Sequence, residues 1–211
     1  MASIERNSGK RISFVLATAA IPLFCYFVAA LVVLHVLKPD YTVVDHMVSD
    51  YAVGRYGWIM TTAFASAALG CLMLGAGLLG GGPVTWAGRL GAILLLITSA
   101  GLMVTAIFPT DLETAPSTPT GDIHAMSFFV NIVAILLSAL LLGFSYRGAV
   151  AWQRYKAAGL GFAALLVVAF VAQFLTLHKG APYGITNRVF VAILMAWLVS
   201  TSFWLREVVS R

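Results

Sequence analysis

Charged side chains are scarce in this sequence, and their scarcity excludes several classes of protein. They make up only 10% of the 211 residues, whereas 61% of the residues are hydrophobic. Soluble domains carry about 25% charged residues, so a soluble domain is excluded. Only four lysines occur, and none lies in the middle of an apolar stretch, which argues against a retinal Schiff base. The apolar stretches also lack a central carboxylate, which argues against a proton-coupled transporter.

Cysteine pairs and nucleotide-binding motifs are also missing. The two cysteines, Cys25 and Cys71, both lie inside apolar stretches, and no C-x-x-C pair occurs. A disulfide framework and a thiol-redox enzyme are therefore not expected. The chain has no Walker loop, no dinucleotide-binding glycine pattern and no H-E-x-x-H motif. Its net charge of +5 is divided among short loops, which indicates contact with membrane lipid headgroups and argues against nucleic-acid binding.

Six long apolar stretches dominate what is present. They cover approximately residues 12–37, 56–79, 84–108, 123–146, 157–177 and 189–205. A helix needs about 20 apolar residues to cross a hydrocarbon core of about 30 Å. Helices satisfy their own backbone hydrogen bonds in lipid, and the alternation typical of a barrel is not seen. The sequence therefore predicts an all-α polytopic membrane protein, a bundle of six transmembrane helices that forms one domain over residues 1–211.

The basic residues predict the orientation of this bundle. With the N-terminus inside the cell, nine of them lie at inner ends of the stretches: Arg6, Lys10, Arg11, Arg89, Arg147, Arg154, Lys156, Arg206 and Arg211. The outer ends have four: Lys38, Arg55, Lys179 and Arg188. This asymmetry predicts a multi-pass protein of the inner (plasma) membrane with both termini cytoplasmic. All four histidines and six of the eight acidic residues, Glu113 among them, then lie at the outer end, which predicts an outward-facing polar pocket.

The first outer loop contains side chains suited to catalysis or metal binding. If this segment is helical, His46 lies close to Ser49 and Asp50, and Asp45 lies close to Ser49. Such a set can supply a nucleophile with its base, or two ligands of a metal. The alternative is that Ser49 and Asp50 cap the helix that enters the membrane.

The second outer loop and the helix after it carry further polar residues. Asp111 follows the third apolar stretch, and Asp122 is a plausible N-cap of the fourth helix. His124, Ser127 and Asn131 share one face of that helix, and Asn131 lies about two turns into the membrane. Such a polar face normally points toward protein or a polar cavity. The alternative function for these residues is hydrogen bonding between helices.

Asn187 and Arg188 lie at the beginning of the last apolar stretch. The planar guanidinium group of Arg188 suits a phosphate or a carboxylate group of a ligand. The alternatives are a salt bridge to an outer carboxylate, or a position at the lipid interface.

Together these residues predict one outward-facing pocket for a lipid or lipid-linked molecule. The predicted catalytic residues are His46, Ser49, Asp50, Asp111 and His124, and the predicted ligand-binding residues are Asp45, Asn131, Asn187 and Arg188. Hydrolysis or transfer at the headgroup is the enzymatic hypothesis; a non-catalytic binding or accessory protein and a small-solute transporter are the alternatives. If a metal is bound, zinc on His46, Asp50, Asp111 and His124 is expected, although the charge of Arg188 favours a metal-free network.

The chain resembles the bacterial membrane family known as domain of unknown function 998 over nearly its whole length. The shared residues are His46, Ser49 and Asp50 after the first helix, Phe108 and Pro109 at the end of the third, His124 in the fourth and Arg188 in the sixth. Asp50 stands where glutamate is common in that family, and it keeps the charge. The resemblance implies a six-helix membrane protein and no established activity. The chain is more weakly similar to the Frag1/DRAM type of six-helix proteins, some of which are linked to lipid remodelling; function does not follow from that similarity.

Overall fold

In the computed structural model, the chain forms a bundle of long α-helices that alternate in direction. The structure describes residues 2–112, 115–178 and 180–211; Glu113 and Lys179, which the sequence assigns to outer loops, lie outside the described residues. The α-helices are α1 (Ala2–Leu37), α2 (Gly57–Gly81), α3 (Trp86–Ile107), α4 (Pro119–Ser145), α5 (Lys156–Leu175) and α6 (Tyr183–Ser210), and the 3-10 helices are η1 (Val48–Ala52) and η2 (Val150–Tyr155). The described ranges contain six helices long and apolar enough to cross a membrane, and no strand. The predicted fold class is therefore confirmed.

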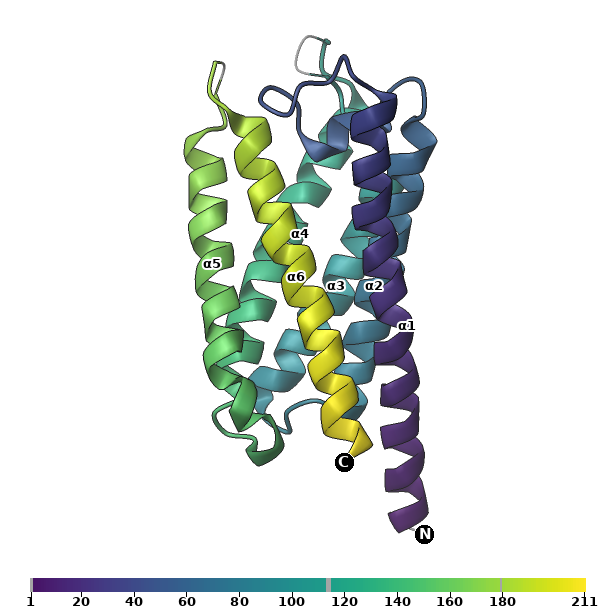
Figure 1. The fold of residues 1–211 in the computed structure, drawn as a ribbon, viewed down its shortest axis with the longest axis vertical. Helices are drawn as coiled ribbons and strands as arrows, with labels where there is room; N and C mark the ends of the chain where they lie inside the picture. The colour runs from purple at the N-terminus through teal and green to yellow at the C-terminus, as the bar shows by residue number, and fades with distance from the viewer. Residues whose placement is uncertain (1, 113–114, 179) are drawn as a thin grey trace.

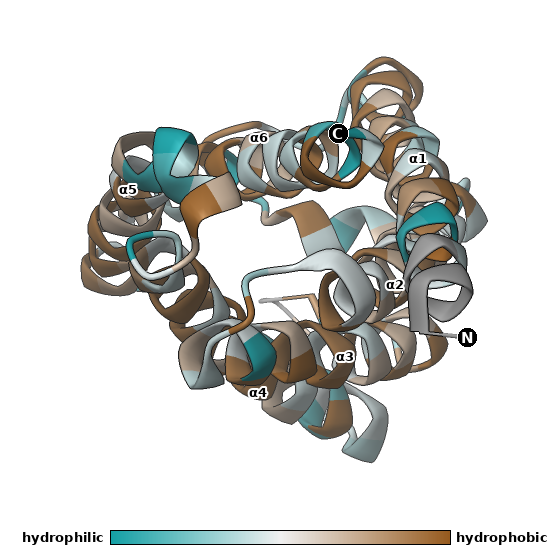
Figure 2. Cartoon of the chain, turned by 90° about the horizontal axis from the view of Figure 1, so that it is seen from below, coloured by the Kyte–Doolittle hydropathy of each residue, from teal (hydrophilic) through white to brown (hydrophobic). Residues whose placement is uncertain are grey.

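The six α-helices close into a ring. Each packs against the next along the chain, and α6 packs against α1 (Figure 2). α2 also contacts α6. Both chain termini lie at one end of the bundle, called the terminal end (Figure 1). The opposite end, called the loop end, carries η1 and the loops that precede α4 and α6, and hence the predicted site residues.

The start of α4 is fixed by an N-cap at Thr118, whereas the sequence suggested an N-cap at Asp122. The helix begins at Pro119, and the N-cap is Thr118, whose hydroxyl accepts a hydrogen bond from the backbone N–H of Gly121 at 3.1 Å. Proline suits the first turn because its missing N–H would be unpaired there anyway. Asp122 lies inside the first turn, so the prediction that it caps the helix is wrong. Thr118 is held in turn by Asp111, which accepts from its backbone N–H at 2.7 Å and from its hydroxyl at 2.9 Å.

The last helix begins earlier than its apolar stretch. α6 begins at Tyr183, whereas the apolar stretch begins near residue 189. Asn187 and Arg188 therefore lie in the second turn of a helix and not in a loop. Asn187 is buried and Arg188 is half-buried, so both side chains are held against neighbouring parts of the bundle.

Small side chains allow α2 to lie inside the bundle. Ala63, Ala67 and Cys71, which recur at four-residue spacing, are all buried. Gly70 lies so close to the ring of Phe24 on α1 that an added Cβ would be 2.6 Å from it. Small residues let helix backbones approach closely in lipid. The four-residue spacing of small side chains on α2 therefore serves packing within the bundle.

Candidate functional site

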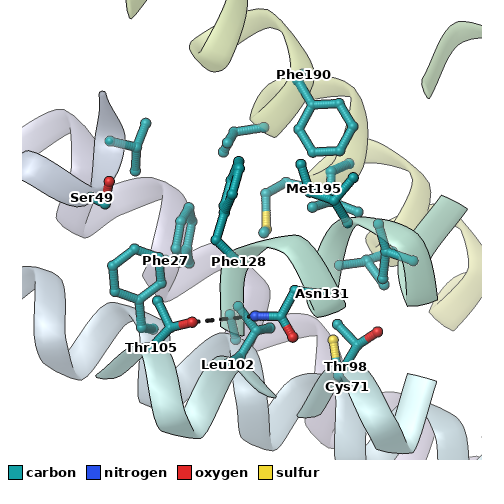
Figure 3. Close-up of a pocket in the computed structure, with 18 of the residues that line it drawn as sticks. Phe27, Ser49, Cys71, Thr98, Leu102, Thr105, Phe128, Asn131, Phe190 and Met195 are labelled. Atoms are coloured by element: carbon teal, nitrogen blue, oxygen red, sulfur yellow. Dashed lines mark hydrogen bonds between the residues drawn. The ribbon is translucent and has the colours of Figure 1, made fainter. Parts of the chain in front are cut away.

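An interior cavity of about 90 Å³ opens among the helices in the half of the bundle next to the loop end. Most of its wall is apolar, with the rings of Phe27, Phe64, Phe128 and Phe190 contributed by α1, α2, α4 and α6. Figure 3 shows three of these rings, Phe27, Phe128 and Phe190. Polar lining residues come mainly from the loop end: Ser49, Thr105, His124, Asn131 and Asn187. Among the described residues that line the cavity, none is charged. The cavity is therefore amphipathic and uncharged.

His124 lies where α4 meets the end of α3. Its side chain is buried, and its ring packs edge-on against Phe64 with centroids 6.4 Å apart. The last carbonyl groups of a helix lack hydrogen-bond donors within the helix. His124 supplies a donor for one such carbonyl at the end of α3, because its Nδ1 lies 2.8 Å from the carbonyl oxygen of Phe108. A carbonyl only accepts, so Nδ1 carries the hydrogen. In the neutral ring, Nε2 is then the acceptor.

The polar face predicted for α4 points into the bundle. Ser127 and Asn131 are buried below His124 and meet Thr105 of α3. The hydroxyl groups of Thr105 and Ser127 are 2.9 Å apart, and the amide nitrogen of Asn131 donates to the Thr105 hydroxyl at 3.2 Å (Figure 3). These contacts are the interhelical hydrogen bonds that the sequence left as an alternative. The amide oxygen of Asn131 is buried without a hydrogen-bond partner among the described residues.

Asn187 connects α6 to the 3-10 helix above the cavity. Its Oδ1 accepts from the backbone N–H of Val48 at 2.9 Å, which uses the acceptor of the amide. The NH2 group of Asn187 is left as a donor at the cavity wall, because no hydrogen bond joins it to another described residue. Ser49, next to Val48 in η1, lines the same cavity, so the sequence-predicted residues Ser49, His124, Asn131 and Asn187 share this site.

Arg188 donates five hydrogen bonds, three of which fix the first loop and none of which goes to a carboxylate. Its Nε donates to His35 Nε2 at 2.9 Å, its Nη1 to the carbonyl oxygens of His46 at 2.5 Å, Gly184 at 2.9 Å and Val43 at 3.2 Å, and its Nη2 to the Tyr51 hydroxyl at 3.2 Å. Arg188 and these acceptors are called the Arg188 cluster. His35 can accept because its Nδ1 is 2.7 Å from the carbonyl oxygen of Leu31 and so carries the hydrogen. The guanidinium group, expected to bind a ligand or a carboxylate, is occupied by the protein's own loop.

Lys38 holds the same loop from the end of α1. This lysine is buried, and its Nζ donates to the carbonyl oxygens of Val53 at 2.5 Å and Tyr51 at 3.5 Å. The same Nζ lies 3.9 Å from the centroid of the Tyr41 ring. Burial lowers the pKa of Lys38, and the nearby charge of Asp50 opposes that lowering. Burial also raises the pKa of the Tyr41 hydroxyl, and Asp50 and Tyr51 act in the same direction.

The predicted set in the first loop does not lie on one helical face. The 3-10 helix begins only at Val48, so His46 precedes it, and its ring stacks on Tyr41 with centroids 4.5 Å apart. Asp50 caps η1 by accepting from the backbone N–H of Met47 at 2.7 Å. Asp45 is exposed and bonds the hydroxyl of Thr42 at 2.8 Å. The helical pairing of His46 with Ser49 and Asp50 is therefore wrong, because long-range contacts from α1 and α6 shape this loop.

The remaining carboxylates line a different pocket. Asp50 and Asp111 lie with His178 and Tyr183 around an open surface pocket of about 250 Å³ at the loop end, separate from the interior cavity. Within the described ranges, no group of three or more histidine, cysteine, aspartate or glutamate side chains is placed to hold a metal ion. The zinc set of His46, Asp50, Asp111 and His124 is thus not formed. Asp50 and Asp111 each accept hydrogen bonds from backbone N–H groups of their own loops instead.

Several residues of the site were not found from the sequence. Thr105 is a lone hydroxyl in an apolar stretch and gives no pattern. His35, Lys38, Tyr41 and Tyr51 do give a partial signal, because they cluster in sequence around the outer end of the first helix. Their contacts with Arg188, however, join segments far apart in the chain.

The fold and cavity define the class of this molecule: a six-helix membrane protein with an uncharged amphipathic cavity near one end. The family model described as protein of unknown function (DUF998) matches residues 18–204, and the chain belongs to that family. No curated protein and no solved structure matches the chain. A relation to the Frag1/DRAM type is not shown by these comparisons.

Proposed function

We propose that the protein binds a single-chain lipid in the interior cavity. The observation that carries this proposal is the division of the cavity wall into an apolar part and a polar part at the loop end. Lipid tails fit the phenylalanine-lined wall, whereas the polar end of the molecule meets Ser49, His124 and Asn187. A volume of about 90 Å³ corresponds to roughly three water molecules at about 30 Å³ each, which suits a polar group and the first methylenes of one chain and not a two-chain lipid.

Binding is better supported than hydrolysis. No carboxylate is among the described lining residues, so His124 has no acidic partner in the cavity. One observation favours an enzymatic role as the second candidate: Ser49 and His124, a hydroxyl and an imidazole with an accepting nitrogen, line the same space. Replacing Ser49 by alanine distinguishes the two roles, because an enzyme loses turnover of an ester lipid whereas a binding protein has none to lose.

The membrane orientation forms part of the proposal, with the loop end outside the cell and both termini in the cytoplasm. The exposed positions Ala115 at the loop end and Val150 at the terminal end suit cysteine labelling in a Cys25→Ala, Cys71→Ala background. A membrane-impermeant reagent added to intact cells should label Ala115→Cys and not Val150→Cys. The reverse pattern would place the cavity near the inner leaflet and overturn the orientation.

Lipid binding is tested with a variant that fills the cavity. Leu102 lines it from α3, so Leu102→Trp should reduce the lipid retained through purification, measured by mass spectrometry of extracts and normalised to protein. Leu69→Trp is the matched control, because Leu69 lies on α2 with 40% of its surface exposed and is not among the lining residues. Equal lipid content in wild type and Leu102→Trp would contradict the proposal.

A further inference from the structure

We infer that the polar group of the bound lipid is an uncharged hydroxyl, so that the ligand is a lipid alcohol. This inference rests on the proposed function and specifies the ligand class for the same cavity. It follows from three features: the absence of charge among the described lining residues, an acceptor on His124 and a donor on Asn187.

The acceptor is Nε2 of His124. The hydrogen on Nδ1 is committed to the carbonyl oxygen of Phe108, so Nε2 presents a lone pair. Only a ligand that donates a hydrogen satisfies this nitrogen. An ether or an ester has no such hydrogen, whereas an alcohol has one.

The donor is the NH2 group of Asn187. Its Oδ1 is committed to the backbone N–H of Val48, so the amide offers only N–H groups to the cavity. The hydroxyl of Ser49, which also lines the cavity, both donates and accepts. An alcohol oxygen accepts from such donors while its hydrogen is donated to His124. A hydroxyl therefore matches both kinds of group.

An anionic headgroup is disfavoured because the nearby cations are already engaged. The guanidinium group of Arg188 donates to three backbone carbonyls, a histidine and a tyrosine, and the ammonium of Lys38 donates to two carbonyls. Neither side chain lines the cavity. Transferring an unpaired phosphate from water to such a site is costly, since a buried charge needs a partner. The expectation that Arg188 binds an anionic headgroup therefore gives way to the binding of an uncharged polar group in the cavity.

The test is a competition among three probes that share a ten-carbon chain: decanol, decyl methyl ether and decyl phosphate. Delipidated full-length protein is incubated with each probe, and bound probe per chain is measured by native mass spectrometry. We expect decanol to bind about tenfold more tightly than the ether, the equivalent of one net hydrogen bond, and more tightly than the phosphate. Equal binding of alcohol and ether, or tightest binding of the phosphate, would overturn the inference.

Two substitutions that keep the local structure identify the groups responsible. His124→Asn retains a side-chain donor for the Phe108 carbonyl but removes the Nε2 acceptor. Asn187→Asp retains an oxygen for the Val48 N–H but removes the donor. His124→Asn should lower the alcohol-to-ether ratio severalfold, because only the alcohol donates a hydrogen to Nε2. Asn187→Asp should weaken binding of the ether severalfold, because the ether oxygen can only accept from the N–H group that is lost. The ratio is measured within one protein, so a general loss of stability does not change it, and an unchanged ratio in His124→Asn refutes the assignment.

Failure of the inference and failure of the proposed function give different results. If the cavity does not bind lipid, none of the probes binds at one per chain, or Leu102→Trp leaves their binding unchanged. If the cavity binds lipid but does not recognise a hydroxyl, all binding still falls in Leu102→Trp, whereas the alcohol gains nothing over the ether.

Discussion

Replacing Arg188 by lysine distinguishes a structural role for this residue from ligand binding. Lysine keeps the positive charge, so a site that needs only a cation is preserved. It has one nitrogen with three hydrogens, however, and cannot reach the separate acceptors that the guanidinium fork reaches from Nε, Nη1 and Nη2. The structure therefore predicts that Arg188→Lys destabilises the loop end even when no ligand is bound.

The size of the effect follows from the number of lost hydrogen bonds. Bonds from a charged donor contribute about 1.5–3 kcal/mol each. If lysine loses two of the five bonds, the loss is about 3–6 kcal/mol, and the lower end is expected because water at the loop end reaches some of the freed acceptors. A loss of about 3 kcal/mol corresponds to a decrease in the midpoint of thermal unfolding of roughly 6–12 °C for a chain of this size.

The assay is thermal unfolding of delipidated protein in one detergent, with Arg55→Lys as the control. Arg55 lies at the same end, is exposed, and stacks over the Tyr56 ring at 4.7 Å without a hydrogen bond to another described residue. Its replacement should shift the midpoint by less than about 2 °C, since exposed substitutions change stability little. An Arg188→Lys protein that melts with the wild type would refute the structural role assigned to the Arg188 cluster.

Two further predictions concern close contacts of glycine residues. Gly184→Ala should destabilise the protein by about 1–3 kcal/mol, because the new Cβ would be 2.6 Å from two loop carbonyl oxygens. Gly161→Ala is the control: its new Cβ meets nothing within 4 Å, so it should stabilise the protein by up to about 1 kcal/mol. Thermal unfolding measures both effects. In Gly101→Ala the Cβ would be 1.9 Å from the amide oxygen of Asn131, so adding Asn131→Ala should recover most of the lost stability, and purely additive effects would contradict this contact.

The number of membrane helices and the depth of each polar residue could be predicted from the sequence. Apolar length alone decides whether a helix spans a bilayer, so the six-helix fold followed without tertiary information. Counting residues from the ends of the stretches likewise placed His124 and Asn131 near one end of the bundle. The spacing of His124, Ser127 and Asn131 also predicted a common buried face, which the structure confirms.

Loop conformation could not be predicted in the same way. His46, Ser49 and Asp50 were expected on one helical face because local spacing is the only geometry that a single segment provides. In the folded chain, Arg188 of α6 and Lys38 at the end of α1 bind carbonyl oxygens in and around this loop. Those contacts leave Ser49 at the cavity and separate it from Asp50, which lines the surface pocket.

The sequence by itself determined which residues lie at the same depth in the membrane, because hydropathy and helical rise fix position along the bundle axis. Only the tertiary structure decided which of these residues meet, because that depends on how each helix is rotated within the closed ring and on where its first turn begins. Asn187 shows the difference: its depth follows from the apolar stretch, but its contact with Val48 exists only because α6 begins at Tyr183 and packs beside η1. The uncharged cavity has the same origin, since its wall combines side chains from five helices and a loop that no local pattern connects.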